Sequence, residues 1–353
     1  MLSGSRLAVD RALEDFLSGA SAQLNAIDSH MAPVSAALGE FLAGGKRLRP
    51  LFAVAGYVGA QEFGSDGVAP EVYRALISLE LLQACALIHD DMMDGSDTRR
   101  GAPSMHRRFE SEHRLRDGVG ESEHFGSAAA LLMGDLALVL SAQALNSSGI
   151  NDAQLRMVAP LFDTMKVELM AGQYLDMHAG SRDEISVDDT LKIATYKSGK
   201  YTIERPLHFG GALALCSQEI SSIYTAYGIP LGIAFQMRDD LLGVFGDSTV
   251  TGKPAGDDLL EGKRTALIAY ALQHMNQADV SEFMELFGDR KVNESEIERM
   301  RVLIRSAGAV DFIEKLIEEK TNLALAAADS KKISQPGQDL LRELAILATQ
   351  RSA

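Results

Sequence analysis

Hydrophobic residues recur every three to four positions along most of the chain, which is the period of an amphipathic α-helix. Alternating runs rich in Val, Ile and Thr, which would indicate strands, are lacking. The pattern therefore predicts an all-α protein. Helices are expected at residues 6–29, 33–42, 48–60, 70–93, 125–147, 152–178, 187–199, 201–215, 219–246, 263–276, 279–287, 294–306, 308–330 and 335–351.

The same pattern indicates how the chain is organised. No linker rich in Gly, Ser or Pro divides it, so we expect residues 1–353 to form a single domain. The polar stretch 110–124 interrupts the helical pattern and predicts a mobile surface loop. Ser186, with Asp189 three residues later, predicts the start of a helix, and the pair Gly44-Gly45 predicts the end of one.

One helix that is apolar nearly all round ends in clustered carboxylates. Residues 76–88 predict a buried helix, and Asp90, Asp91 and Asp94 follow it closely. Asp90 and Asp94 are four residues apart, so they share one helix face and would repel each other without a cation between them. A solvated acidic surface is the simpler alternative, but the buried helix that precedes these residues disfavours it.

A second apolar helix, which includes Ile229, ends in Asp239 and Asp240. A site with few carboxylates suits Mg²⁺, which keeps water and substrate phosphates as its other ligands. Basic residues that can bind phosphate follow both acidic segments. They are Arg99 and Arg100 after the first, and Lys253, Lys263 and Arg264 after the second. We therefore expect the two acidic helix ends to face each other across one cavity and to hold a diphosphate substrate.

Composition and charge narrow the function further. The chain has 353 residues and a formal net charge of −15, which argues against a nucleic-acid-binding surface. Local basic clusters and metal ions must therefore capture any anionic substrate. Asp135 interrupts the apolar segment 127–145, so no membrane span is expected. Cys85 and Cys216 both lie in apolar runs, which favours reduced, buried thiols in a cytoplasmic protein.

Five segments in this order resemble those of the trans-isoprenyl (polyprenyl) diphosphate synthase family, most of all its short-chain geranylgeranyl members. The resemblance extends over residues 30–330 and rests on residues 44–50 (Gly-Gly-Lys-Arg-Leu-Arg-Pro), 90–94, 99–100, 197–199 and 235–240. It implies a bundle of about a dozen helices of the isoprenoid-synthase type around a central apolar cavity. It also implies a prenyltransferase that depends on Mg²⁺, with three ions, and forms a homodimer.

The resemblance assigns roles to individual residues. The metal ligands it implies are Asp90, Asp91, Asp94, Asp239 and Asp240. The residues it implies for isopentenyl diphosphate are Lys46, Arg49, Gln83 and Arg100, with Arg47 pointing elsewhere. For the allylic diphosphate and for catalysis it implies Arg99, Lys197, Ser198, Gln236, Lys253 and Lys263. Two positions depart from the family pattern: Ser198 replaces a threonine, and Gly243 stands where the family more often has aspartate.

Product length is expected to depend on Cys85 and Ala86, which precede Asp90 by five and four residues. In the family that this chain resembles, bulky aromatic residues at these positions stop growth at fifteen carbons. Both residues here are small, so we expect C5, C10 and C15 allylic diphosphates to be extended by isopentenyl diphosphate, head to tail, to all-trans geranylgeranyl diphosphate (C20). A farnesyl product or a product of C25 and above is the alternative.

Three other classes are compatible with parts of the pattern. A class I terpene cyclase also uses an Asp-Asp-x-x-Asp segment, but it would need no isopentenyl site such as Lys46 and Arg49. A non-catalytic subunit of a heteromeric prenyltransferase should have lost its acidic segments, whereas this chain keeps both. The pair His89-Asp90 also occurs in metal phosphohydrolases, but the further histidine ligands of that class are hard to place here.

Overall fold

The chain folds into helices that surround a central cavity, and the computed structural model describes residues 1–61, 67–182, 185–246 and 256–350. A short hairpin of strands β1 (Thr98–Arg99) and β2 (Ala102–Pro103) follows the first acidic segment. The helices are α1 (Leu2–Ile27), η1 (Ser29–Met31), α2 (Ala32–Leu42), α3 (Leu48–Gly59), α4 (Pro70–Met93), α5 (Met105–Leu115), α6 (Ser122–Asn146), α7 (Asp152–Gly180), α8 (Val187–Ala194), η2 (Thr195–Glu204), α9 (Arg205–Leu213), α10 (Gln218–Phe245), α12 (Asp257–Leu260), α13 (Ala266–His274), α14 (Gln277–Leu286), α15 (Glu294–Ser306), α16 (Ala309–Ala328) and α17 (Gln335–Thr349). The all-α prediction is thereby confirmed.

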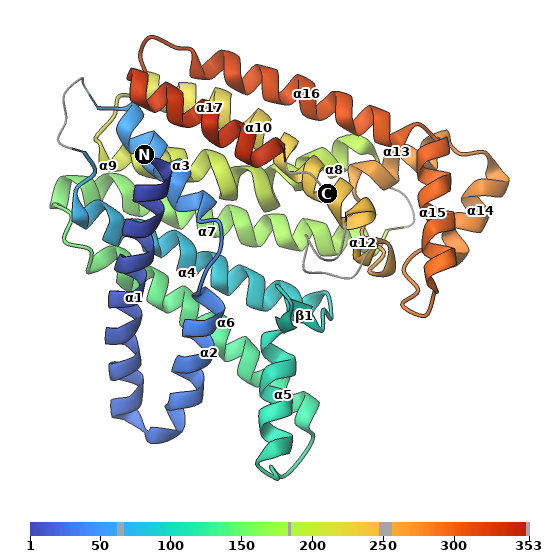
Figure 1. Ribbon diagram of the computed structural model, residues 1–353, viewed down its shortest axis with the longest axis horizontal. Helices are drawn as coiled ribbons and strands as arrows, with labels where there is room; N and C mark the ends of the chain where they lie inside the picture. Colours follow the sequence, from blue (N-terminus) through green and yellow to red (C-terminus); the bar gives the residue numbers. More distant parts are fainter. Residues whose placement is uncertain (62–66, 183–184, 247–255, 351–353) are drawn as a thin grey trace.

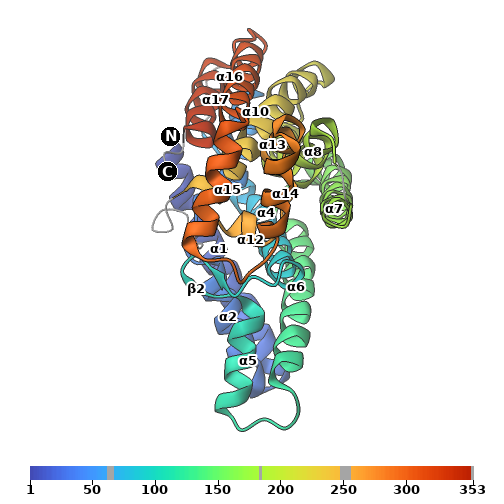
Figure 2. The same cartoon turned by 90° about the vertical axis from the view of Figure 1, so that its right-hand side faces the viewer.

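Two long helices, α4 and α10, carry the acidic segments and form the centre of the bundle. In Figure 1, α10, α16 and α17 lie along one side of the molecule, and α4 and α7 cross its middle. The helices α1, α2 and α5, with part of α6, project as an arm that is also clear in the turned view of Figure 2. α4 packs along α6 and contacts α1 and α3, whereas α10 packs on α16 and η2.

Buried tyrosines fix the position of α10 within this bundle. The hydroxyl of Tyr224 donates to the backbone oxygen of Gly56 in α3 at 2.7 Å, and that of Tyr227 donates to the backbone oxygen of Leu341 in α17, also at 2.7 Å. Both side chains are fully buried, so each phenol needs such a partner. Because these bonds hold α10 against α3 and α17, they help to fix where its acidic end lies.

The loop that was expected at residues 110–124 is shorter in the structure, where only residues 116–121 connect two helices. Residues up to Leu115 belong to α5, and α6 begins at Ser122. The segment is polar enough to resemble a loop, but its charges are spaced for a helix: Arg114 pairs with Glu110 four residues earlier, and Arg108 pairs with Glu112 four residues later. Met105 and Phe109, on the buried side of α5, complete the amphipathic pattern.

The sequence pattern predicted one helix up to residue 199 and another from residue 201, and this predicted break is wrong. Residues 195–204 form one continuous π-helical stretch, η2, between α8 and α9. A π-helix uses wider turns than an α-helix, and such turns are often found at functional sites. Pro206 lies in the first turn of α9, where a proline needs no hydrogen-bond donor.

Candidate active site

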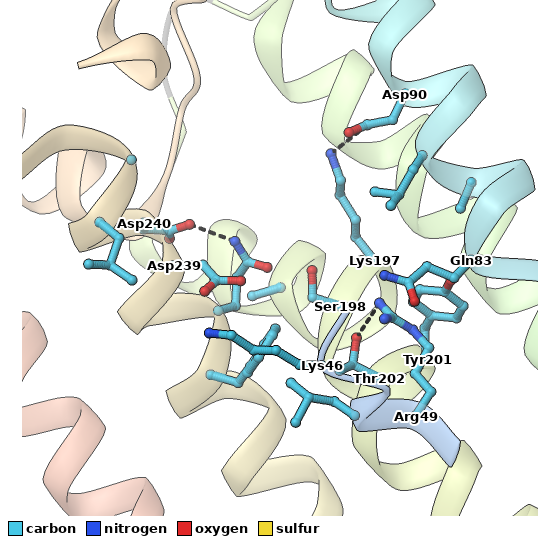
Figure 3. A pocket seen from close by; sticks show the side chains of 18 of the residues that line it. Lys46, Arg49, Gln83, Asp90, Lys197, Ser198, Tyr201, Thr202, Asp239 and Asp240 are labelled. Carbon is cyan, nitrogen blue, oxygen red and sulfur yellow. Dashed lines mark hydrogen bonds and ion pairs between the residues drawn. The ribbon is translucent and has the colours of Figure 1, made fainter. Parts of the chain in front are cut away.

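One cavity of about 1260 Å³ brings the two acidic segments together. Asp90 of α4 lines it together with Asp239 and Asp240 of α10, and Figure 3 shows Asp90 apart from the aspartate pair. The expectation that the two helix ends share one cavity is confirmed. The other residues predicted for the site that line it are Lys46, Arg49, Gln83, Ala86, Arg99, Arg100, Lys197, Ser198, Gln236 and Lys263. Lys253 lies outside the described residues.

Asp90 lies among cations. The ammonium of Lys197 is 3.4 Å from its carboxylate, and the side-chain amide of Gln173 donates to it at 2.8 Å. Burial raises the pKa of Asp90, but the positive charges of Lys197, Lys263 and Arg99 outweigh burial and lower it overall. Asp90 is therefore ionised at neutral pH and available to a metal ion.

Asp91, which was expected to be a metal ligand, is not among the residues that line the described cavity. Successive residues of a helix are turned by about 100° from each other, so Asp91 cannot share the direction of Asp90. Its carboxylate is fully buried and accepts hydrogen bonds from the guanidinium of Arg99, whose Nε lies 2.9 Å from both oxygens. Asp91 thus holds Arg99 at the rim of the cavity, where Arg99 Nη2 lies 3.8 Å from Asp90.

Asp94, at the end of α4, connects the first acidic segment to the region after the second. Lys263 Nζ lies 3.1 Å from its carboxylate and 2.8 Å from that of Glu261. Ser96 donates to Glu261 at 2.9 Å, and Arg290 donates to the backbone oxygen of Asp94 at 2.6 Å. Burial and the charge of nearby Asp90 raise the pKa of Asp94. The charge of Lys263 lowers it, but the pKa is raised overall. Asp94 itself is not among the residues that line the described cavity.

The π-helix η2 presents Lys197 and Ser198 to the cavity. Lys197 Nζ bridges Asp90 and Asp176 of α7, at 3.4 and 2.6 Å. Close backbone contact positions η2: a Cβ on Gly232 of α10 would lie 2.3 Å from the Cα of Gly199, so only glycine fits there. Burial alone would lower the pKa of Lys197, but Asp90 and Asp176 raise it overall, so the ammonium stays charged.

The second acidic segment places a buried carboxyl group among other carboxylates. Asp240 is buried and accepts a hydrogen bond from the amide of Gln236 at 2.7 Å. Burial raises its pKa well above the usual range, and the carboxylates of Asp258, Asp239 and Asp176 raise it further. Negative groups crowded in this way gain from a nearby cation.

Basic residues gather at another part of the cavity. Arg49 lies 4.1 Å above the ring of Tyr201 and donates to Thr202 at 3.0 Å, while its Nε is buried without a partner among the described residues. Burial lowers the pKa of Arg100, and the charges of Arg99, Arg47 and Arg49 lower it further against Glu80. Cations that repel one another in this way are well suited to bind an anion. Figure 3 shows Arg49 and Gln83 close together beside Tyr201, whereas the Lys46 side chain extends toward Asp239.

Arg47, which was expected to point elsewhere, lines the cavity, but its guanidinium is engaged by other groups of the protein. Its guanidinium donates to Asp10 at 2.7 Å, to Glu80 at 2.7 Å and to the backbone oxygen of Leu42 at 2.7 Å. It thereby fastens the loop between α2 and α3 to α1 and α4. Its backbone has a φ of 53°, a left-handed conformation that is strained for a residue with a side chain. We interpret this strain as the result of turning Lys46 and Arg49 toward the cavity.

The two residues expected to set product length face different ways. Ala86 lines the cavity one turn before Asp90, whereas Cys85 does not line its described part. Cys85 is fully buried in the core that α4 forms with α6, with its Sγ 3.8 Å from His89 Nδ1. Burial raises the pKa of this thiol to about 11, so it is inert. Of the two residues expected to set product length, only Ala86 therefore faces the described part of the cavity.

Sequence reasoning missed four residues that line the cavity or contact its carboxylates. They are Glu80, Gln173, Asp176 and Tyr201. Gln173 and Asp176 are three residues apart on α7, and both line the cavity beside Leu169. Residues three apart in a long helix share one face, and this spacing was the one sequence feature that could have indicated that the two residues act together. Tyr201 has a buried hydroxyl without a hydrogen-bond partner in the described structure, a feature that a sequence does not reveal.

The donors present fit Mg²⁺, although no closed cage exists. Within the described ranges, no three acidic, histidine or cysteine side chains form a ready metal site. Mg²⁺ in phosphate-binding sites needs only one or two carboxylates, because water and phosphate oxygens complete its coordination. Asp90, Asp239 and the crowded Asp240 supply such oxygens around one cavity.

Comparisons with known proteins agree with this geometry. A model of the polyprenyl synthetase family matches residues 32–304. The geranylfarnesyl diphosphate synthase of Aeropyrum pernix is 30% identical over 311 residues, or 87% of each chain. The octaprenyl diphosphate synthase of Escherichia coli (strain K12) is 30% identical over 311 residues, which cover 87% of this chain and 86% of the relative.

A solved structure is also similar to this chain in sequence and in fold. The geranylgeranyl pyrophosphate synthase from Corynebacterium glutamicum, complexed with isoprenyl diphosphate and magnesium, is 39% identical, with a TM-score of 0.94 over 99% of this chain and 98% of that one. The names of these relatives indicate products of different lengths. The chain belongs to the polyprenyl synthetase family, whose members are prenyltransferases of isoprenoid biosynthesis.

Proposed function

We propose that this enzyme condenses isopentenyl diphosphate with C5, C10 and C15 allylic diphosphates, head to tail, to geranylgeranyl diphosphate. One observation carries the proposal: the same cavity is lined by carboxylates, at Asp90 and Asp239, and by cations, at Lys46, Arg49 and Arg100. Two diphosphates can then bind differently in one space, one through metal ions and one through direct contact with basic side chains.

The residues around the carboxylates would handle the allylic substrate. Asp90, Asp94, Asp239 and Asp240 would hold Mg²⁺, of which we propose three ions, and the bound metal would stabilise the charge that grows on the leaving diphosphate. Lys197 and Arg99, both beside Asp90, would neutralise the remaining charge. Lys263, which pairs with Asp94, would extend this support, and we assign Lys253 the same role from the sequence resemblance.

The remaining residues would position the second substrate and the reacting carbons. Lys46, Arg49, Arg100 and Gln83 would bind isopentenyl diphosphate so that its terminal double bond lies against the allylic carbon. As the allylic C–O bond breaks, its electron pair leaves with the diphosphate and the double bond forms the new C–C bond. The proton lost from isopentenyl carbon 2 would pass to that diphosphate. The Ser198 hydroxyl and the Gln236 amide would direct their dipoles toward the developing cation.

The product length rests on Ala86. A small residue one turn from Asp90 leaves room in the cavity for the growing chain. The solved relative from Corynebacterium glutamicum is named as a geranylgeranyl pyrophosphate synthase, which favours C20 over the longer products of the other relatives. Incubation with Mg²⁺, isopentenyl diphosphate and each primer in turn, followed by chromatography of the dephosphorylated products, tests this. We expect C20 from all three primers and no product in excess EDTA.

Two outcomes of that experiment would contradict the proposal in different ways. A dominant C15 product, or one beyond C30, would overturn the assigned length and leave the prenyltransferase activity in place. No product from any primer in the presence of Mg²⁺ would overturn the activity itself, as expected of a non-catalytic subunit.

We also propose that residues 1–353 act as a single domain, in the cytoplasm, as a homodimer. Two helices, α4 and α6, are long and apolar enough to cross a membrane by length and composition. α4 is a core helix, since 67% of its apolar window is buried, whereas only 44% is buried in α6. Along α6, Phe125, Leu132 and Val139 recur every seven residues and are all exposed. A second copy of the chain would cover this stripe.

A further inference from the structure

The second acidic segment of this chain lacks its last carboxylate. Asp239 and Asp240 are followed by Leu241, Leu242 and Gly243, so the position four residues after Asp239 carries no side chain. On a helix, that position shares a face with Asp239. Gly243 also lines the cavity, so its missing side chain leaves a space beside the site.

The carboxylate of Asp258 occupies that space. A Cβ placed on Gly243 would lie 1.9 Å from Asp258 Oδ2 and 2.4 Å from its Cγ. Real Cβ contacts are never this short, so any other residue at position 243 would force Asp258 to move. Asp258 belongs to α12, the short helix after the second acidic segment, and its side chain is 14% exposed. The carboxylate therefore approaches the end of α10 from a different element.

Asp258 is also connected to the first acidic segment. Lys263 Nζ lies 3.7 Å from Asp258 Oδ1 and 3.1 Å from Asp94 Oδ2. Asp258 lines the same cavity as Asp90 and Asp239. Its carboxylate thus lies at the part of the cavity where the metal-bound diphosphate of the proposed function would sit.

We propose that Asp258 supplies, from α12, the carboxylate that position 243 lacks, and that Gly243 is required because it makes room for this carboxylate. The inference rests on the proposed function, because it concerns the same Mg²⁺-diphosphate site. It assigns Asp258 to the metal-binding group. It also assigns Gly243 a steric role, so a carboxylate moved to position 243 should replace the one at position 258.

Metal binding without turnover tests the proposal directly. The probe is Mn²⁺, titrated by calorimetry and electron paramagnetic resonance in the presence of inorganic pyrophosphate. Asp258→Asn, which keeps the shape of the side chain, is expected to weaken Mn²⁺ binding at least about 10-fold. Gly243→Ala should weaken it too, because the new Cβ displaces Asp258. The double variant Gly243→Asp/Asp258→Asn should recover most of the lost affinity.

A matched control separates metal binding from the pairing with Lys263. Glu261 lies closer to Lys263, at 2.8 Å, but it is not among the residues that line the described cavity. Glu261→Gln should therefore leave Mn²⁺ affinity within about 3-fold if Asp258 acts on the metal rather than on Lys263. Thermal unfolding in EDTA checks that each variant is folded.

The outcomes separate this inference from the function on which it rests. Mn²⁺ binding by Asp258→Asn equal to that of the parent, or a double variant no better than Asp258→Asn, would overturn the role of Asp258 alone. An equal loss in Glu261→Gln would overturn it as well. A parent chain that binds no Mn²⁺ with pyrophosphate would overturn both this inference and the proposed function.

Discussion

The guanidinium of Arg47 lies 2.7 Å from the carboxylate of Glu80, and both side chains are only 4% exposed. Burial lowers the pKa of Arg47, but the charge of Glu80 and the hydrogen bonds to Glu80 and Asp10 raise it overall, so the guanidinium stays charged. One oxygen of Glu80, Oε1, has no hydrogen-bond partner in the described structure. This pair is the point at which the loop that carries Lys46 and Arg49 joins α4.

Removing one partner of this pair should destabilise the enzyme strongly. Glu80→Gln leaves the buried Arg47 charge without its main partner, and loss of one member of a buried pair costs about 3–5 kcal/mol. Equilibrium unfolding in urea measures the free energy of unfolding. The double variant Arg47→Met/Glu80→Leu should lose less than the sum of the single variants, because no isolated charge remains. A loss below about 1 kcal/mol for Glu80→Gln would contradict this interpretation.

Adjacent positions on α4 should respond differently to the same added bulk. Leucine at position 86 extends into the cavity one turn from Asp90, so Ala86→Leu should shift the product toward shorter chains. Cys85→Leu places the same side chain in the core between α4 and α6. There it should cost about 1–3 kcal/mol of stability and leave the product lengths unchanged.

Chromatography of the dephosphorylated products and thermal unfolding, measured on both variants, separate the two effects. Shorter products from Cys85→Leu with unchanged products from Ala86→Leu would reverse the assignment of the two helix faces. That result would restore the expectation that the sequence alone gave for Cys85.

The buried His208 should make stability fall in mild acid. Burial lowers the pKa of His208. The charge of Arg205, whose Nη1 lies 3.3 Å from His208 Nδ1, lowers it further, and the charge of Glu204 acts in the opposite direction. His208 is then neutral in the folded protein, whereas an unfolded chain takes up a proton below about pH 6.5. Unfolding therefore gains a proton, and the free energy of unfolding falls as pH drops from about 6.5 toward the lower folded pKa.

This pH dependence is tested by comparing the parent with the variant His208→Gln. One such proton changes the free energy of unfolding by at most about 1.4 kcal/mol per pH unit. Urea unfolding of the parent and of His208→Gln between pH 7.5 and pH 5 (~2.5 pH units) should show a shallower slope in the variant. His106, whose pKa burial also lowers, would supply part of the slope that remains. Equal slopes would show that His208 does not carry this dependence.

Local patterns determined most of the fold because each core helix has a long apolar stripe. The predicted ranges 48–60 and 70–93 differ from α3 and α4 by at most one residue at an end. α5 was missed because only Met105 and Phe109 mark its apolar side, and its ion pairs resemble the charges of a loop. The π-helical turn η2 was missed because a wider turn follows from packing against α7 and α10, which a single segment does not encode.

The site was predictable where a residue's type alone determines its role. The carboxylate of Asp90 and the cations of Lys46 and Arg49 stand out in an apolar context, and all three line the cavity. Direction was harder to predict, because it depends on the exact rotation of a helix. Asp91 and Cys85 each lie one residue from a cavity-lining position and point elsewhere. Asp176 and Glu80 lie in helices that the sequence predicts, but no motif marks them as site residues, so their place at the cavity emerges from the packed structure.

The exposed stripe of α6 should hold two copies of the chain together. The side chain of Leu132 is 68% exposed in the middle of this stripe, between Phe125 and Val139. A charge at the centre of an apolar interface would be buried without a partner, at a cost of several kcal/mol. Leu132→Glu should therefore convert a dimeric enzyme into a monomer of 38.0 kDa in size-exclusion chromatography with light scattering. Leu323 of α16, which is 51% exposed, provides the matched control, because Leu323→Glu adds the same charge outside the stripe. If Leu132→Glu remains a dimer, the contact between the two copies lies elsewhere on the molecule. If the parent is already a monomer, the proposed dimer does not exist.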